Sequence, residues 1–154
     1  LRVRGVAPVV GILLVSIYQG KATHMSNTSL AGEHNAQTSL VTGGAGFIGS
    51  HTCVELLEQN YNVVILDDLS NSCVTAVDRI RELSGANADQ LKFVEASIRD
   101  REACERVFSE NDIDAIIHFA GFKAVGESTQ KPLEYYWNNV AGSLVLLTWP
   151  ATTA

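Results

Sequence analysis

Short apolar runs alternate with helical stretches between residues 38 and 147, and this alternation constrains the fold more than any other feature of the sequence. The apolar runs are residues 38–42, 62–66, 91–94 and 114–119, and the stretches with a helical pattern are residues 49–59, 75–83, 101–110 and 133–147. The second run, Asn-Val-Val-Ile-Leu, is apolar at consecutive positions, which is typical of a strand buried on both faces. The alternation therefore predicts an α/β fold with a parallel sheet and helices on both of its faces.

A glycine cluster lies between the first apolar run and the first helical stretch. The sequence VTGGAGFIGSH, which begins at Val41, contains a G-x-x-G-x-x-G pattern at Gly43, Gly46 and Gly49. Gly43 would allow a tight turn, Gly46 would let a pyrophosphate approach the backbone, and Gly49 would let the helix pack closely on the sheet. The phosphates would lie at the positive end of that helix. Because the cluster follows a strand and opens a helix, it predicts dinucleotide binding by a Rossmann-type doubly wound sheet.

An acidic residue, Asp67, follows the second apolar run, 18 positions after Gly49. A carboxylate at the end of this strand accepts hydrogen bonds from the adenosine ribose hydroxyls and repels a 2′-phosphate. The sequence therefore predicts NAD, and not NADP, as the cofactor. The alternative interpretation of Asp67 is an acid on a surface turn.

Composition and charge exclude several classes of protein. The net charge of −6 argues against a nucleic-acid partner, because a general nucleic-acid binder needs a basic face. With 46% hydrophobic residues, the chain of 154 residues can form one domain with a core, but it is too short for two. The cysteines Cys53, Cys73 and Cys104 are widely spaced and predict free thiols in a reducing compartment. We therefore expect a cytoplasmic location and no metal site.

The first 37 residues differ from the rest of the chain. Residues 6–18 form an apolar run of 13 residues, preceded by Arg2 and Arg4. This run is shorter than the roughly 20 residues that a membrane-spanning helix needs, and no small-x-small cleavage site follows it. Both a stray extension and a targeting segment fit the pattern, and the motifs downstream favour the extension. We expect residues 1–37 to be an N-terminal extension or linker, without membrane association.

Four segments carry a family resemblance. They are VTGGAGFIGSHT from Val41, LDDLSNS from Leu66, IHFAGFKAVGEST from Ile117 and KPLEYYWNN from Lys131. Together they resemble the N-terminal part of the UDP-glucose 4-epimerase family, also called UDP-galactose 4-epimerases, in the extended short-chain dehydrogenase/reductase superfamily. The resemblance implies an incomplete NAD-binding Rossmann domain over residues 38–147, and residues 148–154 form a tail outside the family pattern.

The resemblance also implies contacts with NAD along several stretches. Phe47 and Ile48 match positions over the pyrophosphate, residues 67–72 match the adenosine-ribose loop, and Lys123 would lie near the ribose and phosphates. With the glycines included, the expected cofactor-binding residues are Gly43, Gly46, Phe47, Ile48, Gly49, Asp67, Asp68, Leu69, Ser70, Asn71, Ser72, Ser97, Ile98, Phe119, Ala120, Gly121, Phe122, Lys123 and Asn138. His118, at the end of the fourth apolar run, is expected to be a core histidine.

The family's reaction implies a catalytic pair that this sequence does not contain. In the family, NAD takes a hydride from C4 of a UDP-linked hexose and returns it on the other face, and a Tyr-x-x-x-Lys pair supplies the base. The residues four positions after Tyr18, Tyr61, Tyr135 and Tyr136 are Ala22, Ile65, Asn139 and Val140. No catalytic residue is therefore assigned, and we expect this chain to be inactive by itself.

The sequence leaves three functions open. The first is a truncated UDP-glucose 4-epimerase of galactose metabolism, whose full-length form takes a UDP-hexose substrate and forms a homodimer. The second is another nucleotide-sugar epimerase or dehydratase of the same superfamily. The third is a catalytically inactive NAD-binding module.

Overall fold

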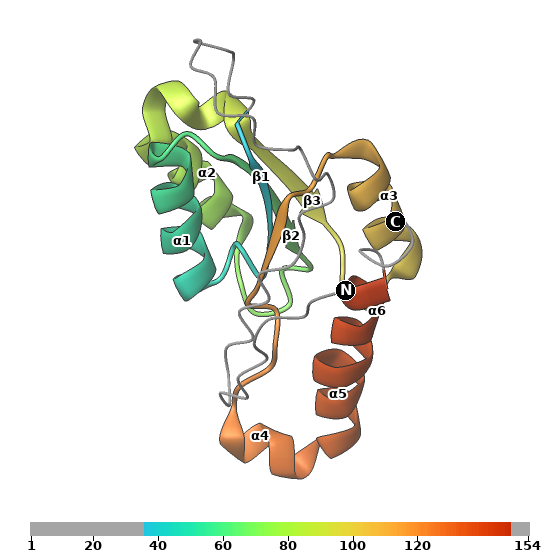
Figure 1. Ribbon diagram of the computed structural model, residues 1–154. Helices are drawn as coiled ribbons and strands as arrows, with labels where there is room; N and C mark the ends of the chain where they lie inside the picture. The colour runs from blue at the N-terminus through green and yellow to red at the C-terminus, as the bar shows by residue number, and fades with distance from the viewer. Residues whose placement is uncertain (1–35, 149–154) are drawn as a thin grey trace, which may run out of the picture.

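Four parallel strands form the centre of the structure, a computed structural model that describes residues 36–148 (Figure 1). The strands are β1 (Thr38–Thr42), β2 (Asn62–Asp67), β3 (Leu91–Glu95) and β4 (Ala115–His118). Their order in the sheet is β3-β2-β1-β4, and every neighbouring pair is parallel. The expected extension and tail lie almost wholly outside the described residues.

Alternating side chains of the central strands build two separate cores. On β1, Val41 belongs to one hydrophobic cluster and Leu40 to the other, and on β2 Ile65 and Val64 divide in the same way. All four side chains are almost completely inaccessible to solvent. Because successive residues of a strand point to opposite faces, a continuous apolar run can fill a core on each side of the sheet.

Helices cover both faces of the sheet (Figure 1). The first core is closed by α1 (Phe47–Glu58) and α2 (Val74–Ser84), and η1 (Gly85–Gln90) leads from α2 into β3. The second core is closed by α3 (Arg101–Glu110) and by α6 (Ser143–Thr148), which contributes Leu146. The predicted α/β fold with a Rossmann-type parallel sheet is confirmed.

The last part of the described chain is more finely divided than predicted. The single helix expected over residues 133–147 consists of α5 (Pro132–Tyr136), the π-helical turn η2 (Trp137–Gly142) and α6, and a further short helix, α4 (Val125–Gln130), precedes it. No buried residue lies in α4, so no apolar periodicity marks it in the sequence. The π-turn packs closely, since a Cβ atom at Gly142 would lie 2.6 Å from Cδ1 of Ile98.

The remaining element boundaries either agree with the predictions, as for β1 and α3, or differ from them by one or two residues. Helix α1 begins at Phe47, two residues before the expected position 49, because Gly46 serves as its N-cap. Strand β4 is shorter than the expected range 114–119, although both flanking residues still bond to β1, through Asp114 N to Thr38 O and Phe119 N to Thr42 O. Within residues 36–148, no helix has the length and apolar character needed to cross a bilayer.

Candidate dinucleotide-binding site

The glycine turn between β1 and α1 forms one wall of a cleft at the carboxyl end of the sheet. Gly43 has a φ of +69°, and its N–H donates to the carbonyl of Leu66 across the β1–β2 boundary. A Cβ atom at Gly43 would lie 2.7 Å from the backbone nitrogen of Ala120, in the segment after β4. Position 43 therefore requires glycine for two reasons, the left-handed backbone conformation and the close approach of another chain segment.

The first turn of α1 lies along the cleft. Gly46 is the N-cap of this helix and provides no side-chain cap, and Gly46, Phe47, Ile48 and Gly49 all line the cleft. A Cβ atom at Gly49 would clash with the carbonyl oxygen of Gly43, which agrees with the predicted role of this glycine in close packing. The first N–H groups of a helix lack intrahelical partners and carry a positive partial charge, so this turn suits a pyrophosphate.

Asp67, at the end of β2, is buried and is bonded by its own chain. Its Oδ2 accepts a hydrogen bond from Ala45 N at 2.9 Å, and its Oδ1 accepts from Leu69 N at 3.0 Å and Ser72 Oγ at 2.8 Å. The carboxylate therefore ties the glycine turn to the loop that follows β2. A carboxylate offers about four acceptor positions, so these three bonds leave room for one ribose hydroxyl.

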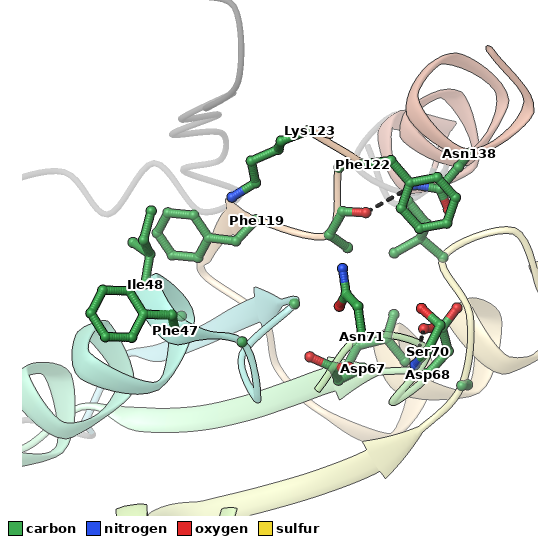
Figure 2. A pocket seen from close by; sticks show the side chains of 18 residues that line it. Phe47, Ile48, Asp67, Asp68, Ser70, Asn71, Phe119, Phe122, Lys123 and Asn138 are labelled. Atoms are coloured by element: carbon green, nitrogen blue, oxygen red, sulfur yellow. Dashed lines mark hydrogen bonds between the residues drawn. The ribbon is translucent and has the colours of Figure 1, made fainter. Parts of the chain in front are cut away.

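The cleft brings together 16 of the 19 residues expected to contact a cofactor (Figure 2). Its lining residues are Gly43, Gly46, Phe47, Ile48, Gly49, Leu66, Asp67, Asp68, Ser70, Asn71, Ala96, Ile98, Phe119, Ala120, Gly121, Phe122, Lys123 and Asn138. Leu66 and Ala96 line it without having been predicted from the sequence. They directly adjoin predicted residues, and their positions, at the end of β2 and directly after β3, give no separate signal in the sequence.

Three of the expected residues do not line the cleft. Leu69 packs against the first core with a positive φ of 55°, and Ser72 donates its hydroxyl to Asp67. The hydroxyl of Ser97 accepts bonds from the backbone nitrogen and Nε of Arg99. Leu69 and Ser72 thus hold the Asp67 carboxylate through hydrogen bonds, while the Ser97 hydroxyl is bonded within its own loop.

Two consecutive asparagines of the π-turn bond the segment that follows β4. The buried Asn138 donates from Nδ2 to the carbonyl of Ala120 at 2.9 Å, a bond drawn in Figure 2. Asn139 accepts at Oδ1 from Phe122 N at 2.8 Å and donates from Nδ2 to Phe122 O at 2.9 Å. Sequence analysis missed Asn139, because only its position next to Asn138 could have drawn attention to it.

His118 is a buried histidine, as predicted, and links β1, β4 and α6 through hydrogen bonds. Its Nδ1 lies 2.6 Å from Thr42 Oγ1 and its Nε2 lies 3.1 Å from Ser143 Oγ, which itself donates to Asn139 O. The Ser143 proton is thus used, so Nε2 of His118 donates to Ser143 and Nδ1 accepts from Thr42. Burial lowers the pKa of His118 to about 4, and the ring is therefore neutral near pH 7.

Lys123 brings positive charge to the lining of the cleft. This exposed residue extends from the segment after β4 toward the side where Phe47 and Ile48 lie (Figure 2). An ammonium group there suits an anionic ligand. Among residues 36–148, no cluster of His, Cys, Asp and Glu side chains could hold a metal ion.

The position of the cleft follows from the strand order. The chain runs from β1 outward through β2 to β3 and then returns to the other side of β1 with β4. In open α/β sheets, ligands bind outside the carboxyl ends of the strands at such a reversal of order. Fold and cleft together define a Rossmann-type domain with an open cleft at its switch point.

Comparison with known proteins identifies the family. The family model described as GDP-mannose 4,6 dehydratase matches residues 40–153, and the chain belongs to this family. UDP-glucose 4-epimerase of Bacillus subtilis is 58% identical over 107 residues, which are 70% of this chain and 31% of that protein. The resemblance seen in the four sequence segments is thereby confirmed.

Comparison with solved structures also finds UDP-glucose 4-epimerases. UDP-glucose 4-epimerase of Bifidobacterium longum, in complex with NAD⁺ and UDP, is 50% identical with a TM-score of 0.69, covering 73% of this chain and 32% of that one. The enzyme of Stenotrophomonas maltophila, with bound NAD and formylated UDP-arabinopyranose, is 48% identical with a TM-score of 0.68 and the same coverage. The chain thus spans about a third of the length of the relatives that it matches.

Proposed function

We propose that these residues are the NAD-binding part of a UDP-glucose 4-epimerase, which interconverts UDP-galactose and UDP-glucose in galactose metabolism. The observation that carries the proposal is the cleft at the β1–β4 switch point, where 16 of the residues assigned to NAD by resemblance meet. Relatives at 52–58% identity that bear this enzyme's name support it.

Each part of the cleft fits one part of the dinucleotide. The pyrophosphate would lie against the N-terminal turn of α1, close to Gly46, where helix N–H groups and the helix dipole favour negative charge. The adenosine ribose would reach the remaining acceptor position of Asp67, whose carboxylate disfavours the 2′-phosphate of NADP. Lys123 adds a positive charge to the lining of the cleft.

The chemistry of the reaction is divided between this domain and the rest of the protein. Bound NAD would supply a reversible hydride acceptor for the sugar. The residues described here bind and orient the cofactor, and none of them is proposed as the base. Tyr135 does not suit that role, because loss of solvent around its hydroxyl and the bonded Glu127 carboxylate raise its pKa. We propose that the catalytic pair and the UDP-hexose contacts lie in the other two thirds of the protein.

A nucleotide-sugar dehydratase is the second candidate, and the description of the matching family favours it. The two candidates differ in their product, because an epimerase returns a hexose with the 4-hydroxyl inverted and a dehydratase releases water. Chromatography of UDP-sugars after incubation of the full-length protein with UDP-galactose would separate them. Appearance of UDP-glucose supports the epimerase, and a 4-keto-6-deoxy product supports the dehydratase.

We also propose that the full-length protein is a homodimer located in the cytoplasm. An exposed apolar strip along α5, η2 and α6, which includes Tyr136, Trp137, Val140 and Leu144, supports association, since Trp137 is 63% exposed. The three free thiols support a reducing compartment. Light scattering of the full-length protein tests the first part, and cell fractionation tests the second.

Titration of the purified 154-residue chain with NAD and NADP tests the cofactor assignment directly. We expect saturable binding of NAD and at least tenfold weaker binding of NADP. Circular dichroism first establishes that the chain is folded under the conditions of the titration. A folded chain that binds neither dinucleotide, or binds NADP as tightly as NAD, contradicts the proposal.

A further inference from the structure

The segment between β4 and α4 forms one wall of the cleft without belonging to a helix or strand. It runs from Phe119 to Ala124, and its residues 119–123 all line the cleft. Beyond the bond from Phe119 N to Thr42 O, this segment has no ladder of backbone hydrogen bonds to fix its conformation, so its polar backbone groups need other partners. Its shape therefore depends on the side chains that bond it.

Asn139 bonds this segment as a neighbouring strand would. Its carboxamide accepts from Phe122 N and donates to Phe122 O, at 2.8 and 2.9 Å, and thus satisfies both backbone groups of one residue. The same Oδ1 also accepts from Nδ2 of Asn138 at 3.1 Å, which orients the amide that bonds Ala120. Two residues of the segment, Ala120 and Phe122, are therefore fixed from the π-turn.

The backbone of Asn139 is itself held by a partly buried chain of hydrogen bonds. Ser143 donates to the carbonyl of Asn139 at 2.6 Å, His118 bonds Ser143, and Thr42 bonds His118. Thr42 and His118 are paired residues at the ends of β1 and β4. The π-turn is thus anchored on the two strands that flank the cleft. Single π-turns within α-helices are frequent at functional sites.

We propose that Asn139 is a positioning residue that holds residues 119–123 in the conformation that receives the dinucleotide, before the dinucleotide binds. This inference rests on the proposed function. When a binding-competent conformation is only partly populated, the apparent affinity falls by the same fraction. Loss of the Asn139 bonds should therefore weaken NAD binding even though Asn139 itself does not line the cleft.

The test compares two asparagines with the same substitution in the full chain. Asn139→Leu removes both bonds to Phe122, and Asn139→Asp keeps an acceptor for Phe122 N but sets a carboxylate oxygen against Phe122 O. Asn111→Leu is the matched control, because the half-buried Asn111 also makes two side-chain bonds, to Val107 O and from Lys92 Nζ, at the far end of α3. NAD dissociation constants are measured at a temperature at which circular dichroism shows every variant folded.

We expect Asn139→Leu to raise the dissociation constant for NAD about tenfold or more, and Asn111→Leu to leave it within about twofold of the parent value. Amide hydrogen exchange at Phe122 reports the bond to Asn139 directly, and recovery of slow exchange on NAD binding is the result that a merely structural role does not give. Exchange should be fast in the Asn139 variants without NAD and slow again when NAD saturates them. If Asn139→Leu does not fold, Asn139→Asp takes its place with the same expectations.

The outcomes of these experiments distinguish a failure of the inference about Asn139 from a failure of the proposed function. Unchanged NAD affinity in a folded Asn139 variant, equal losses in the Asn139 and Asn111 variants, or slow Phe122 exchange in the variant without NAD overturns the inference while leaving the proposed function intact. A folded parent chain that does not bind NAD overturns the proposed function and this inference with it. The exchange rates then still report whether the Asn139 bonds exist.

Discussion

Replacement of Asp67 by asparagine should destabilise the domain even when no dinucleotide is present. The carboxylate accepts three bonds from its own chain, and one of these reaches the glycine turn through Ala45 N. An asparagine retains a single acceptor oxygen, so in either orientation its NH₂ group faces at least one N–H or O–H donor. The substitution therefore removes charge-assisted bonds and leaves a buried donor without a partner.

The loss can be estimated from the bonds themselves. A hydrogen bond to a charged group contributes about 1.5–3 kcal/mol, and an unsatisfied buried donor costs about 1–3 kcal/mol. Because these contributions overlap at one site, we expect a loss of about 3 kcal/mol in the free energy of unfolding. This is a large share of the roughly 5–15 kcal/mol that stabilises a typical domain.

Urea denaturation followed by circular dichroism, without NAD, measures this loss. Asp68→Asn is the matched control, because the neighbouring carboxylate accepts a bond only from Ser70 N among those described, and an asparagine can keep it. We expect the control to change the unfolding free energy by less than about 0.5 kcal/mol. Ser72→Ala combined with Asp67→Asn should be non-additive by about 1–2 kcal/mol, because both changes remove the same bond.

The reasoning is refuted if Asp67→Asn destabilises the chain no more than Asp68→Asn does. Additive effects of Asp67→Asn and Ser72→Ala would also contradict it. In either case Asp67 would contribute to cofactor binding alone, as the sequence by itself suggested. A stable Asp67→Asn variant that no longer prefers NAD over NADP would be the clearest form of that result.

Three further perturbations follow from the same structure. Gly43→Ala should lower the free energy of unfolding, measured by urea denaturation, by more than about 2 kcal/mol, because Gly43 has a positive φ and lies against Ala120. Gly126→Ala is the control and should be neutral or slightly stabilising, because a Cβ atom there would meet no atom within 4 Å. The pKa of His118 is about 4 in the folded chain and 6.5 in the unfolded chain, so the unfolded chain binds more protons between pH 4 and 6.5. The free energy of unfolding is therefore highest above pH 6.5 and falls by up to about 3 kcal/mol as the pH drops to 4. His118→Asn should remove this pH dependence in urea titrations. A thiol reagent at pH 8 should label the exposed Cys73 quickly, since the hydrogen bond with Thr75 lowers the pKa of this thiol. Burial raises the pKa of the other two cysteines, so the reagent should reach them only after unfolding. Rapid labelling of more than one thiol in the folded chain would contradict this expectation.

The fold was predictable because its signals are local. Each strand of the sheet is a short apolar run, and the run at residues 62–66 is apolar on both faces because it fills two cores. The helix over residues 101–110 was predicted at its observed boundaries, and Asp100 caps it by accepting a bond from Ala103 N. In contrast, α4 has no buried face and therefore leaves no periodic signal.

The candidate site was predictable where a motif places residues on consecutive positions. The glycine turn and the residues 119–123 after β4 could be found in this way, and the structure brings them together in one cleft. The bond of Asp67 to Ala45 N and the bonds of Asn139 to Phe122 could not, because each joins segments that are separated in the sequence. Ser97 was matched by resemblance alone, and its hydroxyl instead accepts bonds from Arg99, two residues away.

The sequence by itself determined the alternation of strands and helices, the glycine turn and the family. These depend on side-chain periodicity and on backbone freedom at single positions, which act over a few residues. Only the tertiary structure decided that Asp67 bonds the glycine turn through Ala45 N, and that the π-turn that contains Asn139 supports the wall of the cleft. The reason is physical, because a hydrogen bond between distant segments exists only after the sheet has brought the carboxyl ends of β1, β2 and β4 together.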